Sequence, residues 1–443
     1  PDLNGYAIRS HDLLISLKDQ GICDPVVLTS PYYPDREAMR HDTIVDGIEY
    51  SRSDLGVKTS ASKKQLGFNI PKSEPFVLRA PKFALYKLNL GLKLLTRPVY
   101  TRVTMLWRFF GEKRMMKKFE NEIIAHARKS KPDIIHAHTP FRVGLPALRA
   151  ARKIGIPFVY EVRGMWEDSA VAQGRWSAKS IPYRYYRSQE NKLIKQADEV
   201  IVIGQNLMNE VVGRNLRINS PTMIPNAVGR NMASHPLDFE QPPPESVNEL
   251  VNRLGLKEST IVVGYIGSLR ALEGVDYTAK AVANCVSDGL DIRFLVCSSK
   301  KNQTHLRDLC SHLQIEDQSF IEGPYPHDEI VHFYDLIDIF VVSRPDTNVT
   351  RIVPPIKPLE AMIREKPTVV AHLPALCEII DHRVTGMTFP AEDVVALSAV
   401  ISELASDPDL RNKLGQSSRQ FVLKERTWPK IVHNYEEIYQ RYS

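Results

Sequence analysis

The sequence predicts an α/β protein of two doubly wound domains, each a mostly parallel sheet covered by helices. Its 443 residues exceed what one hydrophobic core usually holds, and two domains of about 200 residues each are the natural division. Both halves of the chain alternate short apolar, β-branched runs with helical patterns, which is typical of parallel sheets. A proline-rich stretch without periodicity separates the halves and indicates a linker.

The C-terminal half shows the alternation of strand and helix most clearly. Each apolar run there is followed by a polar or glycine-containing turn and then by a helical pattern. The strands expected in this half are residues 261–266, 292–297, 320–321, 337–342 and 367–371.

The N-terminal half has the same alternation, with one irregularity at its start. A helix is expected over residues 11–21, and it begins where a first strand should already have ended. A first strand is therefore expected to be missing from the N-terminus as given. The strands expected further on are residues 26–29, 134–136, 157–162 and 199–203.

The linker consists of Ile224-Pro225-Asn226-Ala227-Val228 and then residues 238–246, which contain three consecutive prolines. It divides the chain into an N-terminal domain of residues 1–225 and a C-terminal domain of residues 226–425. Two such domains imply a cleft between them, where ligands commonly bind.

Composition narrows the class of protein. Hydrophobic residues make up 43% and charged residues 25%, as in ordinary globular proteins, and no run reaches the roughly 18 apolar residues of a membrane-spanning helix. The five cysteines are odd in number and scattered, which argues against a disulfide framework or a zinc site and favours a reducing cytoplasm. The start of the chain is not signal-like. A net charge of +6 is modest, and no nucleic-acid partner is expected.

A basic segment interrupts the α/β pattern. Residues 79–118 contain eleven Lys and Arg and one acid, Glu112, interleaved with leucines and aromatic residues. This mixture suits a surface that lies on an anionic membrane, which would make the protein peripheral on the inner face of the cytoplasmic membrane. The alternative is an amphipathic helical insertion of about residues 79–130, packed on its own domain with a solvated basic face.

Two short motifs in the C-terminal half could bind phosphate. Gly264 and Gly267 end an expected strand, and glycine lets the backbone approach a phosphate closely, although tight turns need glycine too. Lys357 and Glu360 lie at an expected helix start, where free N–H groups and the helix dipole attract an anion. Glu360 could accept hydrogen bonds from ribose hydroxyls, or it could simply cap the helix.

Polar residues also follow two expected strands of the N-terminal half. His136 and His138 alternate onto one face of a strand end, where active sites of α/β proteins collect. The stretch from Tyr160 to Asp168 adds a cation, three carboxylates and aromatic residues after the next strand. The alternative is a hydrogen-bonded histidine pair beside a surface loop.

Together these motifs resemble glycosyltransferase family 4, the retaining GT-B enzymes, over almost the whole chain. Asn4-Gly5-Tyr6 is similar to the family's glycine-rich loop near the phosphates, and His138 to the second histidine of its His-x-His segment. Residues 224–228 match the hinge and residues 264–274 the phosphate loop. In the C-terminal domain Gly323 matches the turn beside the base; the remaining matches are Glu360-Ala361-Met362, Glu378 and Thr385-Gly386.

The resemblance implies two Rossmann-like domains that face a cleft, with a C-terminal helix of residues 426–443 returning to the N-terminal domain. More narrowly, residues 160–168, Glu273-Gly274 and residues 357–362 look like bacterial exopolysaccharide and exosortase-associated transferases. The implied reaction moves a sugar, with retention, from a nucleotide-diphosphate sugar, expected to be UDP-linked, to a saccharide or lipid-linked acceptor. No cofactor and no metal ion are expected.

The resemblance also implies a role for each candidate residue. Catalytic roles fall to His138, Arg163 and Lys357. Donor binding falls to Gly5, Gly267, Ser268, Arg270, Gly323, Arg351, Lys357, Leu359 and Glu360. The acceptor would contact His136, Glu161, Trp166 and Glu167.

Three departures from the family pattern concern the donor. In this chain Ile352 stands at the first acidic position of the family's Glu-x7-Glu motif. Ser268 and Glu273 stand where the family usually has the Arg and Lys that hold the diphosphate. Arg270, Arg351 and Lys357 are the available replacements. Pro374-Ala375 replaces the Gly-Gly that the family usually has near the sugar.

Two other functions stay open. A non-hydrolysing sugar-nucleotide epimerase has the same fold and would release a free sugar nucleotide without an acceptor. A non-catalytic subunit that binds a nucleotide sugar or a glycan would bind the donor without turnover, and Ile352 at the acidic position is compatible with it.

Overall fold

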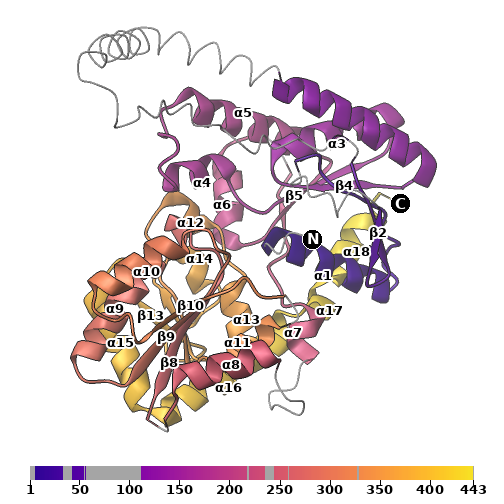
Figure 1. Ribbon diagram of the computed structural model, residues 1–443. Helices are drawn as coiled ribbons and strands as arrows, with labels where there is room; N and C mark the ends of the chain where they lie inside the picture. The colour runs from indigo at the N-terminus through magenta and orange to yellow at the C-terminus, as the bar shows by residue number, and fades with distance from the viewer. Residues whose placement is uncertain are drawn as a thin grey trace, which may run out of the picture. The chain divides into compact units, whose positions relative to one another are not determined.

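The computed structural model describes residues 5–32, 42–53, 55, 111–216, 219–234, 244–257, 259–326 and 329–442 (Figure 1). The chain divides into two compact units. The first comprises residues 1–25, 133–144 and 155–443, and the second comprises residues 26–132 and 145–154.

The larger sheet of the first unit has six parallel strands in the order β10-β9-β8-β11-β12-β13. The sequence reverses direction between the central strands β8 and β11, which is the switch point of a doubly wound sheet. All five strands expected in this half are present, and β13 is a three-residue strand that the sequence pattern missed. The strands are β8 (Ile261–Ile266), β9 (Ile292–Cys297), β10 (Ser319–Glu322), β11 (Ile339–Val342), β12 (Thr368–Ala371) and β13 (Met387–Phe389).

Helices cover both faces of this sheet. One group contains α9, which contacts β9, β11 and α15, and the other contains α13, which contacts β11, β12 and α16. Figure 1 shows the two groups on opposite sides of the strands. The helices are α7 (Arg230–Ser234), α8 (Glu245–Leu254), the 3-10 helix η2 (Ala271–Glu273), α9 (Val275–Ser287), α10 (Gln303–His312), α11 (Ile330–Asp335), α12 (Asn348–Ile352), α13 (Lys357–Ile363), α14 (Pro374–Cys377), α15 (Val394–Ser406) and α16 (Pro408–Glu425).

The second sheet of the first unit has four parallel strands in the order β4-β5-β6-β7. Three of them confirm expected strands, and β7, which the sequence pattern missed, lies directly before residues 224–228. The strands are β4 (Ile135–His138), β5 (Phe158–Val162), β6 (Glu199–Val202) and β7 (Thr222–Met223), and the accompanying helices are α3 (Phe141–Ile154, which ends in the second unit), α4 (Trp166–Ala172), α5 (Ile181–Gln196) and α6 (Gln205–Gly213).

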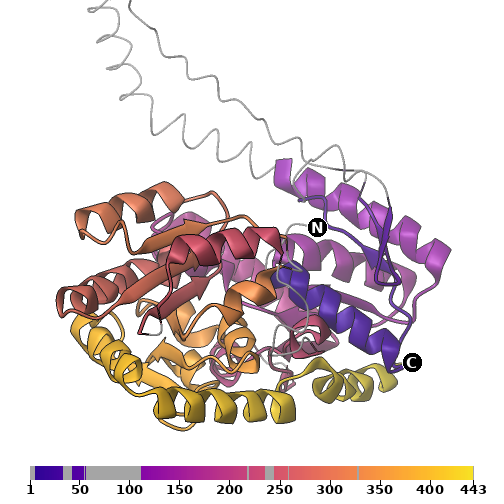
Figure 2. The same ribbon diagram turned by 60° about the horizontal axis from the view of Figure 1, so that its bottom comes forward.

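The two ends of the chain pack together on this sheet. The first helix, α1, spans Gly5–Asp19, so the prediction of a helix over residues 11–21 placed its start six residues too late. Leu13 and Leu17 of α1 share a buried cluster with Val159, Ile201 and four residues of α17 (Trp428–Ile431) and α18 (His433–Gln440), namely Trp428, Ile431, Tyr435 and Ile438. Figure 2 shows the yellow C-terminal helices beside the indigo α1. The expected return of the C-terminal helix is confirmed.

The second unit contains a three-stranded sheet in the order β1-β3-β2. Its strands are β1 (Val27–Leu28), β2 (Thr43–Val45) and β3 (Ile48–Ser51). The strand expected at residues 26–29 therefore belongs to this sheet, not to the sheet of β4, β5 and β6. The sequence pattern placed it wrongly because two apolar residues do not reveal which neighbour a strand will pair with.

Residues 79–110 of the basic segment lie outside the described residues, and residues 111–130 are helical. The buried side chains Met116, Phe119, Ile123 and Ala127 recur every three or four residues, as on one face of a helix. Lys117 and Lys153 both pair with Glu120, at 2.8 and 2.6 Å. The described end of this segment is thus an amphipathic helix with one buried face. Residues 235–243 of the linker, like residues 79–110, lie outside the described part of the chain.

A buried carboxyl group in the first unit holds the start of α3. Glu190 of α5 is buried and accepts hydrogen bonds from the Phe141 backbone N–H and the Tyr160 hydroxyl, both at 2.7 Å. Burial raises the pKa of Glu190 to about 7, and these two hydrogen bonds only partly offset that effect.

Glu190 should make stability fall as the pH rises. An unfolded glutamate titrates near pH 4.3, so between about pH 4.3 and 7 the unfolded chain releases this proton while the native protein keeps it. The stabilising contribution is complete below the unfolded pKa and is lost as the pH rises to the folded pKa. We expect urea unfolding of the wild type and of Glu190→Gln to show the wild type losing stability relative to the variant from pH 5 to 8. If the free energy of unfolding changed with pH in the same way for wild type and variant across this range, the raised pKa of Glu190 would be wrong.

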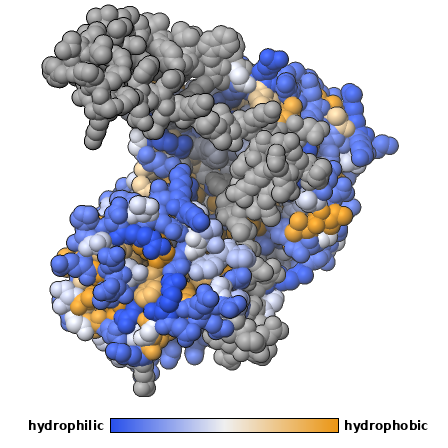
Figure 3. Space-filling view, viewed as in Figure 1, coloured by the Kyte–Doolittle hydropathy of each residue, from blue (hydrophilic) through white to orange (hydrophobic). Residues whose placement is uncertain are grey.

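No helix among the described residues is long and apolar enough to cross a membrane. The face drawn in Figure 3 is mostly hydrophilic over the described residues, and its apolar residues form small, separate groups.

Candidate functional site

The turn after β8 brings two predicted residues together. Gly267 lies where a Cβ would collide with the Lys357 side chain, so only glycine lets that side chain lie against the backbone. The Gly267 N–H donates to the Cys297 carbonyl of the neighbouring strand at 2.9 Å, which fixes the turn. Lys357 begins α13 and also lies 5.7 Å from the centre of the Tyr265 ring. Its ammonium group is thereby held beside the turn.

Glu273, in η2, is the centre of a group of cations. Its side chain is fully buried and accepts hydrogen bonds from Arg270 at 2.9 Å and from Arg344 at 3.0 and 3.1 Å. The Lys357 ammonium lies 3.6 Å from the same carboxylate. Burial alone would raise the pKa of Glu273, but the charges of Arg344, Lys357 and Arg270 lower it. We call these four residues the Glu273 cluster.

Arg344 is the member of the Glu273 cluster that the sequence reasoning missed. It lies two residues beyond the end of β11, and β11 pairs with β8 in the register Phe340 to Gly264. Continued past the strand ends, this register would bring Arg344 level with Ser268, where the family carries an arginine. A cation right after a central strand of a doubly wound sheet is the signal that could have identified it.

Arg351, offered by the sequence as another replacement, is not in this cluster. Its guanidinium pairs with Asp346 at 2.5 and 2.6 Å and the side chain is 55% exposed. Ser268 accepts a hydrogen bond from Arg270 at 3.1 Å, so that residue does lie beside the cluster.

The predicted ribose residue lies near the start of a helix and the predicted base residue at the end of a strand, both in the six-stranded part of the first unit. Glu360 is in the first turn of α13, and its carboxylate accepts a 2.7 Å hydrogen bond from the Tyr334 hydroxyl. Gly323 follows β10, and a Cβ there would meet the Ser298 carbonyl at 2.5 Å, so glycine permits the close approach. Leu359 is buried in the core of the sheet and its helices.

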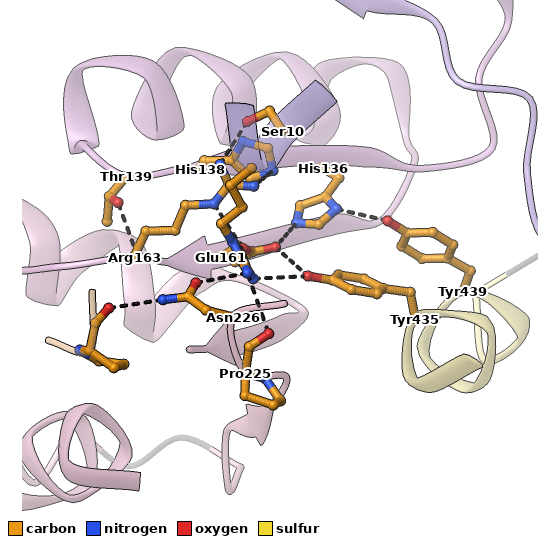
Figure 4. Close-up of polar contacts among 12 residues, drawn as sticks. Ser10, His136, His138, Thr139, Glu161, Arg163, Pro225, Asn226, Tyr435 and Tyr439 are labelled. Atoms are coloured by element: carbon orange, nitrogen blue, oxygen red, sulfur yellow. Dashed lines mark hydrogen bonds and ion pairs between the residues drawn. The ribbon is translucent and has the colours of Figure 1, made fainter. Parts of the chain in front are cut away.

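A second polar group surrounds Glu161 on β5 (Figure 4). One oxygen of its buried carboxylate accepts hydrogen bonds from Arg9 at 2.9 and 3.1 Å and from Arg163 at 2.8 Å. The other oxygen accepts a 2.9 Å hydrogen bond from the Tyr435 hydroxyl of α18. Arg9 also donates to the Asn226 side chain at 2.9 Å. Glu161 thus links α1 and α18 to β5, and Arg9 extends this link to Asn226.

The two histidines of β4 are tied into this group. The Arg163 guanidinium donates to His138 Nε2 at 2.9 Å and to the Ser10 hydroxyl at 2.6 Å. His136 Nδ1 lies 2.8 Å from the Tyr439 hydroxyl. Figure 4 shows both imidazoles beside the Glu161 carboxylate, with Tyr435 and Tyr439 approaching from α18.

Both histidines are neutral at neutral pH. Burial, and then the charge of Arg163, holds the pKa of His138 well below its usual value, and burial lowers the pKa of His136 to about 4. A guanidinium can only donate, so His138 Nε2 accepts and its proton resides on Nδ1. His138 can therefore offer an N–H to a substrate but cannot take a proton at Nε2 while Arg163 is bound there.

One atom each of His136, His138 and Glu161 lies within 4.8 Å of the others, a spacing that could admit a metal ion. Two guanidiniums, however, already contact this set: Arg9 and Arg163 at Glu161, and Arg163 at His138 Nε2. These charges disfavour a further cation. We expect no metal ion to bind here.

The residues predicted for the acceptor differ in exposure. Glu161 and Glu167 are fully buried, Glu167 pairs with Arg214 at 3.0 Å, and His136 is largely covered. Trp166, at the start of α4, is 37% exposed. In this structure the buried carboxylates hold cations in place, and their contact with an acceptor stays a prediction. Gly5 is the first residue of α1.

Two family models match the chain along nearly its whole length. A model described as glycosyl transferase 4-like domain matches residues 4–227, and one described as glycosyl transferases group 1 matches residues 246–421. The chain belongs to this glycosyltransferase family. The resemblance inferred from the sequence motifs is confirmed, and the glycosyltransferase has the GT-B fold.

Curated relatives agree with this family, and solved structures agree with the fold. The α-monoglucosyldiacylglycerol synthase of Streptococcus pneumoniae is 21% identical over 330 residues, 74% of this chain and 71% of that protein. Sucrose-phosphate synthase from Thermosynechococcus elongatus superposes with a TM-score of 0.71 at 15% identity, over 99% of the present chain and 93% of the synthase chain. Anabaena HepE in complex with UDP superposes with a TM-score of 0.59 at 16% identity, over 73% of the present chain and 82% of the HepE chain.

Proposed function

We propose that this glycosyltransferase moves a sugar from a UDP-sugar, with retention of anomeric configuration, to a saccharide or lipid-linked acceptor in the synthesis of a bacterial surface polysaccharide. The Glu273 cluster carries the proposal. Three positive charges, Arg270, Arg344 and Lys357, surround one negative charge, so two positive charges remain to attract a diphosphate. They lie at the carboxyl ends of the two central strands, where doubly wound sheets bind their ligands.

Donor binding by this cluster would suit a nucleoside diphosphate. Glu360 stands one turn into α13, whose start holds Lys357, so a ribose at Glu360 would carry its diphosphate toward the cations. Structures of HepE with UDP and with UDP-glucose favour uridine as the base. Cations that stabilise the leaving diphosphate need no metal ion to do so.

The chemistry around His138 supports a retaining reaction. An inverting transferase needs a group that accepts the proton of the acceptor hydroxyl. His138 Nε2 is occupied by Arg163, and the pKa of Glu161 lies well below its usual value because the charges of Arg163 and Arg9 outweigh the effect of burial. Neither group is a suitable base, and in a retaining reaction the departing diphosphate itself can take that proton.

The first test is a thermal-shift panel of nucleotides and nucleotide sugars. A ligand at 100 times its dissociation constant adds about 2.7 kcal/mol of stability, so UDP should raise the melting temperature clearly. Turnover with an acceptor panel, followed by NMR of the product anomer, then tests the transfer and its stereochemistry. Release of a free sugar nucleotide without an acceptor would indicate an epimerase, and donor binding without turnover a binding subunit.

Glu360→Ala should weaken UDP binding at least about tenfold in calorimetry. Losing a hydrogen bond to a charged group costs about 1.5–3 kcal/mol, and 1.4 kcal/mol corresponds to a factor of ten. Glu365→Ala is the matched control because Glu365 lies just beyond the same helix and faces Arg419 at 3.7 Å. Unchanged UDP affinity in Glu360→Ala would disprove the placement of the ribose.

A lipid-linked acceptor would require the enzyme to reach a membrane. The Streptococcus pneumoniae relative is named for a diacylglycerol product, and the sequence of residues 79–118 carries eleven basic residues. Each basic residue at an anionic surface contributes up to about 1 kcal/mol.

We therefore expect co-sedimentation with liposomes that contain anionic lipid, decreasing as salt is added, and little with neutral liposomes. A variant with Arg97, Arg102 and Arg108 changed to Gln should pellet less. Equal, negligible pelleting with both kinds of liposome would favour a soluble acceptor.

A further inference from the structure

The Glu360 carboxylate is held by a residue that no substrate could reach. Tyr334 of α11 is fully buried, and its hydroxyl donates to one oxygen of Glu360 at 2.7 Å. Its ring packs against Phe340 of β11, with ring centres 5.3 Å apart. Glu360 itself is only partly buried. The tyrosine thus approaches the carboxylate from the protein interior, and the exposed part of the carboxylate is left for a ligand.

The hydroxyl of Tyr334 keeps its proton at neutral pH and acts as a donor. Burial first, and then the neighbouring charge of Glu360, raises its pKa well above the usual value for tyrosine. A short hydrogen bond from a protonated, immobile phenol fixes the rotation of the carboxylate. Without it the Glu360 side chain would have to be oriented by the ligand, at a cost in side-chain entropy.

We propose that Tyr334 is a positioning residue that orients Glu360 for the vicinal hydroxyls of a ribose, and so makes the site selective for ribonucleotides. This inference rests on the proposed function, because it assumes that Glu360 receives the ribose of the donor. A merely structural role is the alternative, in which Tyr334 stabilises the packing of α11 on α13 and has no effect specific to ribose hydroxyls.

The experiment compares UDP and 2′-deoxy-UDP binding by calorimetry in wild type and Tyr334→Phe. This change removes only the hydroxyl, and the ring keeps its contact with Phe340. We expect UDP affinity to fall about three- to tenfold, which corresponds to one neutral donor's typical contribution, and 2′-deoxy-UDP affinity to fall less. The preference for UDP over its deoxy analogue should therefore shrink.

Tyr277→Phe is the matched control. Tyr277 also donates to a glutamate, Glu392, at 2.8 Å, and its loss should leave both affinities unchanged. An equal fall for UDP and 2′-deoxy-UDP in Tyr334→Phe, or no fall, would overturn the positioning role. Failure of the wild type to bind UDP at all would instead refute the proposed function, so the two failures are distinguishable.

Discussion

His138→Ala is expected to lose most sugar transfer, roughly a hundredfold or more, while its UDP affinity stays within a fewfold. His138 ends β4, a strand of the four-stranded sheet, whereas the Glu273 cluster lies at the six-stranded sheet. Its imidazole is neutral and its Nε2 accepts from Arg163, so the Nδ1–H is the group it can offer to the transferred sugar. The loss should therefore appear in kcat at saturating donor.

His136→Ala is the matched control for this prediction. His136 lies on the same strand and is tied to Tyr439, so we expect it to have a structural role in place of the implied acceptor contact, and its loss should cost less turnover. UDP calorimetry and the melting temperature of both variants separate catalysis from folding. Near-full transfer by His138→Ala together with a large loss in His136→Ala would reverse the assignment of the two histidines.

Lys357→Ala is the second variant for which we expect a large effect, a loss of about a hundredfold in kcat with a smaller loss of UDP affinity. The ammonium group stands at the start of α13 and in the Glu273 cluster, where charge on the leaving diphosphate would be greatest in the transition state. The fold should survive, because Arg270 and Arg344 still neutralise the buried Glu273 carboxylate. The melting temperature checks this point.

Arg351→Ala tests the alternative cation by the same assay. Arg351 is exposed and paired with Asp346, so its removal should reduce turnover far less than that of Lys357. A loss from Arg351→Ala as large as that from Lys357→Ala would mean that the diphosphate is held by a different set of cations.

Most strands could be predicted because their apolar runs are long and bounded by turn residues. The run at 261–266 matches β8 residue for residue, since a strand buried on both faces is continuously apolar. The strand β13 was missed because three residues, Met387–Phe389, carry no measurable period. The strand at 26–29 was assigned to the wrong sheet because strand pairing depends on residues far away in the sequence.

Local motifs also identified part of the candidate site. Gly267, Lys357 and Glu360 were found because a glycine turn and a helix start are visible within a few residues. Arg344 was not found, because its meaning depends on the pairing of β11 with β8 and on a buried partner, Glu273, seventy-one residues earlier. The tyrosines of α18 were missed for the same reason.

The sequence by itself determined the family, the two α/β sheets of the first unit, the glycine of the turn after β8 and the lysine and glutamate at the start of α13. Each of these features follows from a local pattern of apolar residues or from a short spacing. Only the tertiary structure decided what the charged residues do. It buried Glu161 and Glu273, and a buried carboxylate keeps its charge only where cations lie close to it. Arg9 and Arg163 therefore gather at one site, and Arg270, Arg344 and Lys357 at the other, from positions that no local pattern connects.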